Sequence, residues 1–370
     1  MESRARPALA LVTSLPADEL EARLVAAGGT LSQARATAGK VIRYIFGGKL
    51  AAALDPAWDA DALGSIGIGA WAQRELLALD ATVSLEIAER APAADGTERL
   101  LLRARDGSLL ETVIIPGPGR TTLCISSQVG CARACAFCET GTMGLVRQLA
   151  AGEIVDQVRI ARTLWGDKHP PISNIVFMGM GEPFDNLGEV ARATRILTDD
   201  RGLAFARSRV TVSTVGVVDK LEAFFASCHA ELAVSLNASD DETRARLMPV
   251  GRRFSIEALM QALERHVPRG HKVLFEYVLI AGVNDSPADA DRLVALTSRV
   301  PSRLNVIPVN PGPDPTLRPP TSAGLSAFVA ALAERGVTTL VRRPRGRDVG
   351  GACGQLAGAR RRLELFAEVP

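Results

Sequence analysis

The feature that most constrains the fold is a regular alternation of apolar strand segments and helical segments that begins near residue 121. Each short run rich in Val, Ile or Leu is followed by a longer segment with apolar residues at helical spacing. Strands joined through helices predict a parallel sheet with right-handed crossovers. We therefore expect an α/β fold, an open partial (β/α)6 TIM-type barrel, with a doubly wound open sheet as the alternative. The six predicted strands are residues 121–127, 172–178, 209–214, 231–236, 272–280 and 303–308.

The chain before this alternation has a different character. Residues 1 to about 80 are rich in alanine and have helical spacing, and residues 82–115 hold short strand-like segments. We expect residues 1–110 to form a small N-terminal accessory domain, helical at first and then made of short strands. Residues 111–348 should form the core domain, and residues 349–370 a C-terminal tail.

Composition restricts the class of protein. Hydrophobic residues make up 47% of the chain and charged residues 23%, as in an ordinary globular protein. No apolar run has the length of a membrane span, and we recognise no signal peptide, so we expect a cytoplasmic protein whose cysteines stay reduced. A net charge of +2 does not indicate nucleic-acid binding by itself, although arginines cluster near the C-terminus. They are either a solvated basic surface or a phosphate-binding one: Arg342, Arg343, Arg345, Arg347, Arg360, Arg361 and Arg362.

Three cysteines lie close together after the first predicted strand, at Cys131, Cys135 and Cys138. A fully ligated four-iron cluster takes four cysteines, so three would leave one iron open to a substrate. This Cys-x3-Cys-x2-Cys spacing is similar to that of the radical S-adenosylmethionine (SAM) enzymes, in which the open iron is chelated by SAM. The alternative is a zinc site completed by a distant ligand. Zinc sites usually contain paired Cys-x2-Cys motifs, and this chain has no second pair.

Polar residues recur where the predicted strands end. In barrels of this type the active site lies at the carboxyl ends of the strands, so these residues should meet at one rim. A glycine-rich turn after the second strand leads to Glu182, and its glycines would let the backbone approach a ligand closely. The later strands end near Ser213, Ser235, Asn237 and Asn310. Each of these alone is more often a turn former than a ligand, so their convergence carries the argument.

The motifs together resemble a known family. The runs CISSQVGCARACAFC (124–138), GMGEP (179–183) and ACGQLAG (352–358) are similar to those of the RlmN/Cfr family of radical SAM adenine methyltransferases. The resemblance extends in order and spacing over about two thirds of the chain, from Glu111 to Gly358. It implies a radical SAM barrel, a 4Fe–4S cluster and SAM as cofactors. It also implies methylation of an adenine carbon in RNA, with 23S rRNA or tRNA as the substrate.

The resemblance also implies a role for each matching residue. The three clustered cysteines would be the cluster ligands. Cys353 would be the cysteine that is itself methylated, Cys124 its resolving partner and Glu111 the proton acceptor. The residues that would hold SAM are Gly181, Glu182, Ser213, Ser235, Leu236, Asn237 and Asn310.

The implied mechanism explains why such residues are needed. An adenine ring carbon between two nitrogens is electron-poor, so direct displacement on the SAM methyl group is implausible. One SAM would methylate Cys353, and a second SAM, reduced by the cluster, would yield a radical that removes hydrogen from that methyl group. The carbon radical would add to adenine, a base would remove the ring proton, and Cys124 would attack the sulfur of Cys353. The resulting disulfide must then be reduced by external thiols.

Alternatives to this interpretation differ in the target. Asn237 stands where the family usually has histidine, and the segment after Cys138 also departs from the common pattern. We expect methylation at adenine carbon 2, with carbon 8, as in Cfr, or a radical SAM enzyme with a different substrate as alternatives. The partners implied are RNA and an electron donor such as flavodoxin or ferredoxin. We expect a monomer, and an accessory domain that is a candidate for RNA binding.

Overall fold

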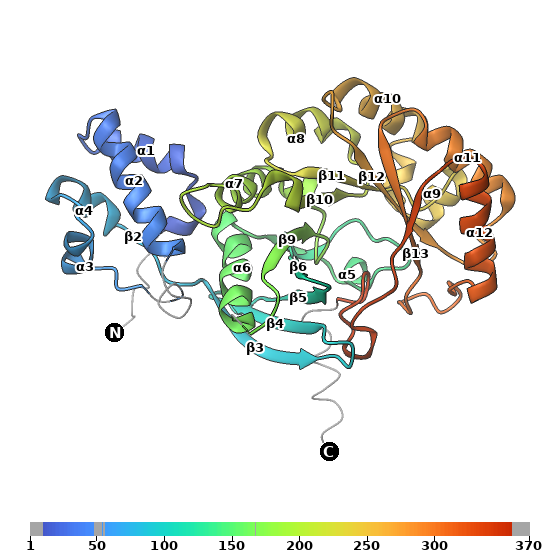
Figure 1. Cartoon of the computed structure of the whole chain (residues 1–370), viewed down its shortest axis with the longest axis horizontal. Helices are drawn as coiled ribbons and strands as arrows, with labels where there is room; N and C mark the ends of the chain where they lie inside the picture. The colour runs from blue at the N-terminus through green and yellow to red at the C-terminus, as the bar shows by residue number, and fades with distance from the viewer. Residues whose placement is uncertain (1–9, 48–53, 55, 167, 357–370) are drawn as a thin grey trace, which may run out of the picture.

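A ten-stranded mixed sheet forms the centre of the protein (Figure 1). The computed structural model describes residues 10–47, 54, 56–166 and 168–356. Seven strands run parallel and follow one another across the sheet in chain order. They are β6 (Arg120–Cys124), β9 (Ile172–Phe177), β10 (Val210–Thr214), β11 (Glu231–Ser235), β12 (Val273–Leu279), β13 (Ser302–Pro308) and β14 (Thr339–Val341).

Helices connect these strands and cover the outer face of the sheet (Figure 1). Every crossover leads to the next strand in the same direction, whereas a doubly wound sheet reverses its strand order. The predicted partial barrel is therefore confirmed, and the doubly wound alternative is wrong. The connecting helices are α6 (Ala151–Trp165), α7 (Leu187–Leu197), α8 (Leu221–Ser227), α9 (Asp241–Leu247), α10 (Ile256–His266), α11 (Pro287–Thr297) and α12 (Ser322–Glu334).

Three antiparallel strands that precede the barrel in the chain extend the sheet. They are β3 (Leu85–Pro92), β4 (Glu98–Ala104) and β5 (Leu109–Gly117), and β5 pairs with β6. Gly107 turns the chain between β4 and β5 with a φ of 85°, a conformation that glycine adopts at little cost. Because β5 pairs with β6, and β4 and β3 follow it in the pairing order, β3 and β4 belong to the main sheet. The predicted domain boundary at residue 110 stays a prediction.

The first helices of the chain form a small core of their own, which includes Leu20, Leu24 and Ile45. Thr30 begins α2 with a capping box, and Glu19 of α1 forms an ion pair with Arg192 of α7. Among the described residues, no helix is both long and apolar enough to cross a bilayer. The elements are β1 (Ala10–Leu11), α1 (Ala17–Ala26), α2 (Leu31–Phe46), α3 (Ala60–Ser65), α4 (Ala70–Leu76) and β2 (Leu79–Asp80).

Candidate active site

A short hairpin carries the three clustered cysteines. Strands β7 (Gln128–Cys131) and β8 (Gly144–Gln148) pair antiparallel. The loop after β7 carries the other two cysteines and leads into the short helix α5 (Glu139–Thr142). Gly130 has a φ of 73°, and a Cβ there would lie 2.0 Å from the carbonyl oxygen of Gly144. Only glycine fits this close approach. The hairpin was not among the predicted elements.

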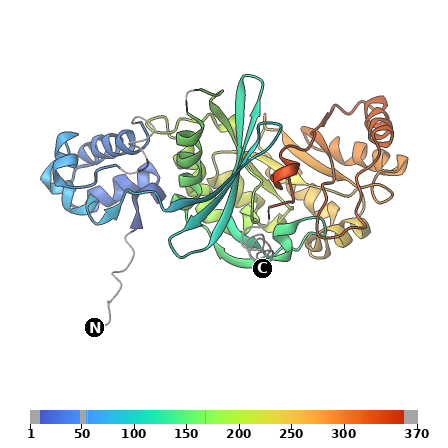
Figure 2. The same ribbon diagram turned by 90° about the horizontal axis from the view of Figure 1, so that it is seen from below.

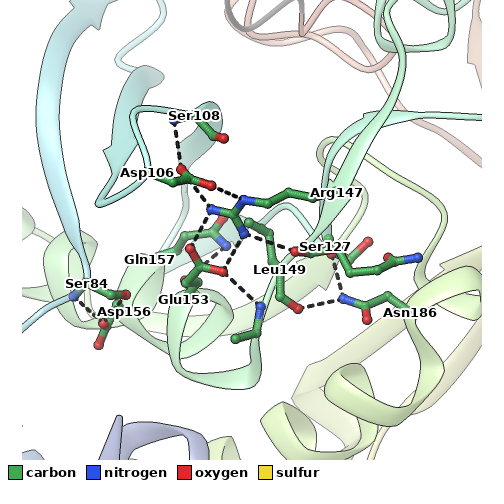
Figure 3. Close-up of polar contacts among 12 residues, drawn as sticks. Ser84, Asp106, Ser108, Ser127, Arg147, Leu149, Glu153, Asp156, Gln157 and Asn186 are labelled. Carbon is green, nitrogen blue, oxygen red and sulfur yellow. Dashed lines mark hydrogen bonds and ion pairs between the residues drawn. The ribbon is translucent and has the colours of Figure 1, made fainter. Parts of the chain in front are cut away.

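A polar network fixes this hairpin to the start of α6 (Figure 3). Arg147 of β8 forms ion pairs with Asp106, in the β4–β5 turn, at 2.5 Å and with Glu153 of α6 at 2.8 Å. Asn186 donates its amide to the carbonyl oxygen of Ser127 (2.8 Å), just before β7. The cysteine loop is therefore held by groups from three separate parts of the sheet and its helices.

The hairpin and the strand ends enclose one cavity, which we call the cysteine cavity. It contains most of the residues that the sequence predicts for the site, so the structure confirms their convergence at one rim. The predicted residues that line it are Cys131, Cys135, Cys138, Gly181, Glu182, Ser213, Ser235, Asn237 and Cys353.

The three thiols of the motif fit a metal cluster. Desolvation raises the pKa of Cys131 to about 12 and also raises the pKa values of Cys135 and Cys138, so without a metal they remain protonated. They are close enough for each thiolate to disfavour the others. Nowhere in the described part of the chain are three or more His, Cys, Asp or Glu side chains arranged to hold a single ion. A four-iron cluster is bound by cysteine thiolates, and three of them leave one iron open, so the three thiols of the motif suit such a cluster.

Glu182 projects a buried carboxylate into the cysteine cavity. Gly181 precedes it at φ 101°, where a Cβ would lie 2.6 Å from the side chain of Gln128. The carboxylate accepts hydrogen bonds from the backbone amides of Phe184 and Val215, both at 2.9 Å. Desolvation outweighs these bonds and raises the pKa of Glu182 to about 7. A cation placed beside this carboxylate would favour its ionised form.

A second cavity adjoins the first, and we call it the thiol cavity. The two share Met178, Ile307 and Cys353, so Cys353 faces both. Cys124, at the end of β6, also lines the thiol cavity. Desolvation raises the pKa values of both thiols, although Cys353 itself is accessible from outside. Both cysteines are free in this structure, so the disulfide that the resemblance implies is not one of its features.

Asn310 holds the loop that carries Cys353. Its amide donates to the carbonyl oxygen of Cys353 at 3.0 Å and accepts from Nε of Arg347 at 2.9 Å. Asn310 lines the thiol cavity rather than the cysteine cavity, so its predicted contact with SAM stays a prediction. The loop turns through Gly350 and Gly354, which have φ values of 59° and 81°. Glycine adopts such positive φ values at little cost, so these residues shape the loop around Cys353.

Two other predicted residues line neither cavity, and a third lines the cysteine cavity but has hydrogen-bond partners within the protein. Leu236 is fully buried in the barrel core. Asn237, at φ 54°, accepts from the backbone amide of Val278 (2.9 Å) and donates to the sulfur of Met248 (3.3 Å), so its amide supports the cavity wall. Glu111 is fully buried in β5 and lines neither cavity. The roles proposed for them stay predictions.

The sequence analysis missed an ion pair between the two cavities, in which the carboxylate is buried and the guanidinium is partly exposed. Glu276 of β12 lines the cysteine cavity and accepts from Ser213 Oγ at 3.3 Å. Arg342 lines the thiol cavity and lies 3.3 Å from the same carboxylate. The signal was a single acidic residue within the otherwise apolar strand run KVLFEYVLI, because a buried parallel strand rarely carries an unpaired charge.

The arginine cluster proposed as a phosphate-binding surface has intramolecular partners. Arg345 pairs with Asp95 at 2.8 Å, and Arg347 and Arg342 contact Asn310 and Glu276 as described above. These contacts give the cluster a structural role in holding the Cys353 loop. Arg343 lines the thiol cavity, and the last three arginines of the prediction, Arg360, Arg361 and Arg362, lie outside the described residues.

Comparison with known proteins identifies relatives over most of the chain. The model of the radical SAM superfamily matches residues 125–294. The chain is 66% identical to a probable RNA methyltransferase of Sorangium cellulosum, over 90% of this chain and 84% of that protein. It is 40% identical to the dual-specificity RNA methyltransferase RlmN of Cereibacter sphaeroides, over 95% of this chain and 90% of that protein.

A solved structure supports the same relationship. The crystal structure of a radical SAM methyltransferase from Sphaerobacter thermophilus superposes with a TM-score of 0.81 at 38% identity. The match covers 94% of this chain and 99% of that one, so it includes the N-terminal helices as well as the barrel.

Proposed function

Because the chain belongs to the RlmN family of radical SAM RNA methyltransferases, we propose that it methylates carbon 2 of an adenine in RNA through a methyl group carried by Cys353. The observation that carries this proposal is the position of Cys353 in both cavities. A thiol that must receive a methyl group on one side and deliver it on the other needs access to both.

The cofactors of the enzyme are a 4Fe–4S cluster and SAM. Cys131, Cys135 and Cys138 would hold the cluster, which when bound supplies the electron that cleaves SAM. Glu182 would accept hydrogen bonds from the ammonium group of SAM, since its carboxylate lies in the same cavity as the three cysteines. Ser213 and the other strand-end groups would satisfy polar groups of SAM.

Three residues would then act on the methyl group and the base. Cys353 receives the methyl group, and its methylated sulfur presents the carbon that joins the adenine ring. Glu111 accepts the ring proton. Cys124, in the same cavity as Cys353, attacks the sulfur and releases the methylated base, and an external thiol reduces the disulfide that forms.

The names of the relatives support RNA as the substrate, and we propose 23S rRNA and tRNA as the RNAs to be tested. We further propose a cytoplasmic monomer that takes electrons from a flavodoxin or ferredoxin, and an N-terminal module that contacts RNA.

The test of the proposed function is nucleoside mass spectrometry of RNA after reaction. The protein would be reconstituted anaerobically with iron and sulfide, then incubated with SAM, reductant and protein-free 23S rRNA or tRNA. We expect 2-methyladenosine. A product of 8-methyladenosine would move the enzyme to the Cfr-type alternative, and 5′-deoxyadenosine without RNA methylation would indicate a different substrate.

Replacing Glu182 with glutamine is expected to weaken SAM binding about 10- to 100-fold, because a charged hydrogen bond contributes roughly 1.5–3 kcal/mol. The two oxygens of the Glu182 carboxylate each accept from a backbone amide, of Phe184 and of Val215. Glutamine would place an NH2 donor against one of these N–H donors. Equilibrium dialysis on the cluster-loaded protein measures the change. Glu189→Gln is the matched control, since Glu189 lies in the first turn of α7, just after the same turn, and does not line the cysteine cavity. Equal affinities of the two variants would contradict the assignment.

A further inference from the structure

One guanidinium connects two carboxylates beneath the Cys353 loop. Arg99 of β4 donates to Glu111 of β5 at 2.5 Å through Nη1 and to Glu89 of β3 at 2.7 Å through Nη2. The Arg99 side chain is 6% exposed and that of Glu111 0%, whereas that of Glu89 is 38% exposed. The three residues lie on adjacent strands at the antiparallel edge of the sheet.

The same guanidinium holds the segment that leads to Cys353. Nε of Arg99 donates to the carbonyl oxygen of Val349 at 2.8 Å. Val349 ends the short helix η6 (Arg347–Val349), which lies beside the antiparallel strands (Figure 2). Because the guanidinium is planar and rigid, its nitrogens fix Glu111, Glu89 and the loop relative to one another.

The main chain at Glu111 is fixed as well. Its carbonyl oxygen accepts from Ser126 Oγ at 2.6 Å, and that hydroxyl oxygen accepts from the backbone amide of Met180 at 2.9 Å. The backbone of Glu111 is thereby connected to the turn that carries Glu182. Its side chain is fully buried, so the carboxylate can meet a base only after the groups that cover it move.

The charges of Arg99, Glu89 and Glu111 allow Glu111 to take up a proton at low cost. A buried carboxylate with one arginine partner is a poor base, because its protonation leaves the guanidinium buried without a countercharge. Here two carboxylates share one guanidinium. When Glu111 becomes neutral, Arg99 keeps its ion pair with Glu89, and the cost of an uncompensated charge is avoided.

We propose that Glu89 and Arg99 are positioning residues for proton removal, with Arg99 aligning Glu111 against the Cys353 loop and Glu89 neutralising Arg99 once Glu111 is protonated. This inference rests on the proposed function. In the step concerned, the C–H bond of the adduct between the base and the Cys353 methylene breaks. Its electron pair stays with the ring, and the proton binds a carboxylate oxygen of Glu111. The proton transfer itself moves no unpaired electron. The adduct is a radical, so one electron must also leave it in a separate step to a one-electron acceptor, a role that the oxidised iron–sulfur cluster would supply.

The experiment compares Glu89→Gln with Glu98→Gln in a single turnover. Glu98 lies on the same hairpin and pairs with Arg90 instead, so its replacement removes a carboxylate without touching Arg99. Each protein is loaded with its cluster, Cys353 is methylated with SAM, and RNA and reductant are added. We expect Glu89→Gln to form 5′-deoxyadenosine at the wild-type rate, to accumulate a covalent protein–RNA species and to release methylated RNA at least about tenfold more slowly. Glu98→Gln should match the wild type in all three readouts.

Two outcomes would overturn the inference. In one, Glu89→Gln releases methylated RNA as fast as Glu98→Gln. In the other, Glu89→Gln slows the methylation of Cys353 as much as it slows the release of methylated RNA, which would indicate a general structural defect. Arg99→Lys keeps the charge but cannot reach three acceptors at once, so it should also accumulate the covalent species; if it does not fold, Glu89→Gln decides alone. A wild-type protein that methylates neither Cys353 nor RNA would refute the proposed function instead.

Discussion

Replacing Cys353 with alanine is expected to abolish RNA methylation while SAM is still cleaved. Cys353 faces both the cavity of the cluster cysteines and the cavity that contains Cys124. In the proposed mechanism it carries the methyl carbon, so no other group can take its place. Loss of a covalent catalytic residue typically lowers activity by about 10⁴-fold or more, and methylated RNA should fall below detection. 5′-Deoxyadenosine should still form slowly, because the cluster and SAM contacts remain.

The control for this variant is Cys124→Ala. Cys124 would act only after the methyl carbon has joined the base, so this variant should methylate its own Cys353 and then remain covalently attached to RNA. Peptide mass spectrometry reads the methylation of Cys353, and a denaturing gel reads the attachment. RNA methylation by Cys353→Ala at more than a trace would contradict a methyl-carrying role for this residue.

Replacing Cys135 with alanine is expected to remove both SAM cleavage and methylation. The thiol lies at the centre of the loop between β7 and β8, and the motif supplies three thiols for the cluster. A site with two thiolates should lose the cluster, since iron–sulfur clusters depend on their thiolate ligands. Iron and sulfide content and the visible absorption of the reconstituted protein measure the loss directly.

Cys228→Ala provides the matched control for that loss. Cys228 is buried in the barrel core and lines neither cavity, so its replacement removes a thiol without affecting the motif. It should retain the cluster and activity, with only a small loss of stability. Equal iron content in Cys135→Ala and the wild type would contradict the assignment of the motif to the cluster.

The barrel was predictable from the sequence because its signal is local. Each of the strands β9 to β13 is a short apolar run bounded by turn residues, and a helix with regular spacing follows. The β7–β8 hairpin was not predictable in the same way. Its strands are short, and glycine and cysteine replace the usual apolar residues in them. The position of β3 and β4 in the main sheet depends on pairing between strands, which periodicity does not encode.

The site residues also differ in whether a local sequence signal reveals them. The strand-end argument predicted that Cys131 and Glu182 would meet, and the resemblance to the family added Cys353. The structure brings the three residues into one cavity. The pair joins Glu276 of β12 to Arg342, which directly follows β14 and is far from β12 in the chain, so neither residue is recognisable as a partner from its own neighbours. For Asn310 the sequence predicted the position but not the contacts. Its place at a strand end was predicted correctly, but its hydrogen bonds hold the Cys353 loop.

The most direct test of the central claim is the isotopic composition of the product formed from SAM with a trideuterated methyl group. If Cys353 carries the methyl group and loses a hydrogen atom from it, one deuterium leaves before the carbon joins adenine, and a solvent proton later takes its place. The 2-methyladenosine should therefore contain a dideuterated methyl group. A product that retains the fully deuterated methyl group would mean direct transfer from SAM to the base, and would contradict the account.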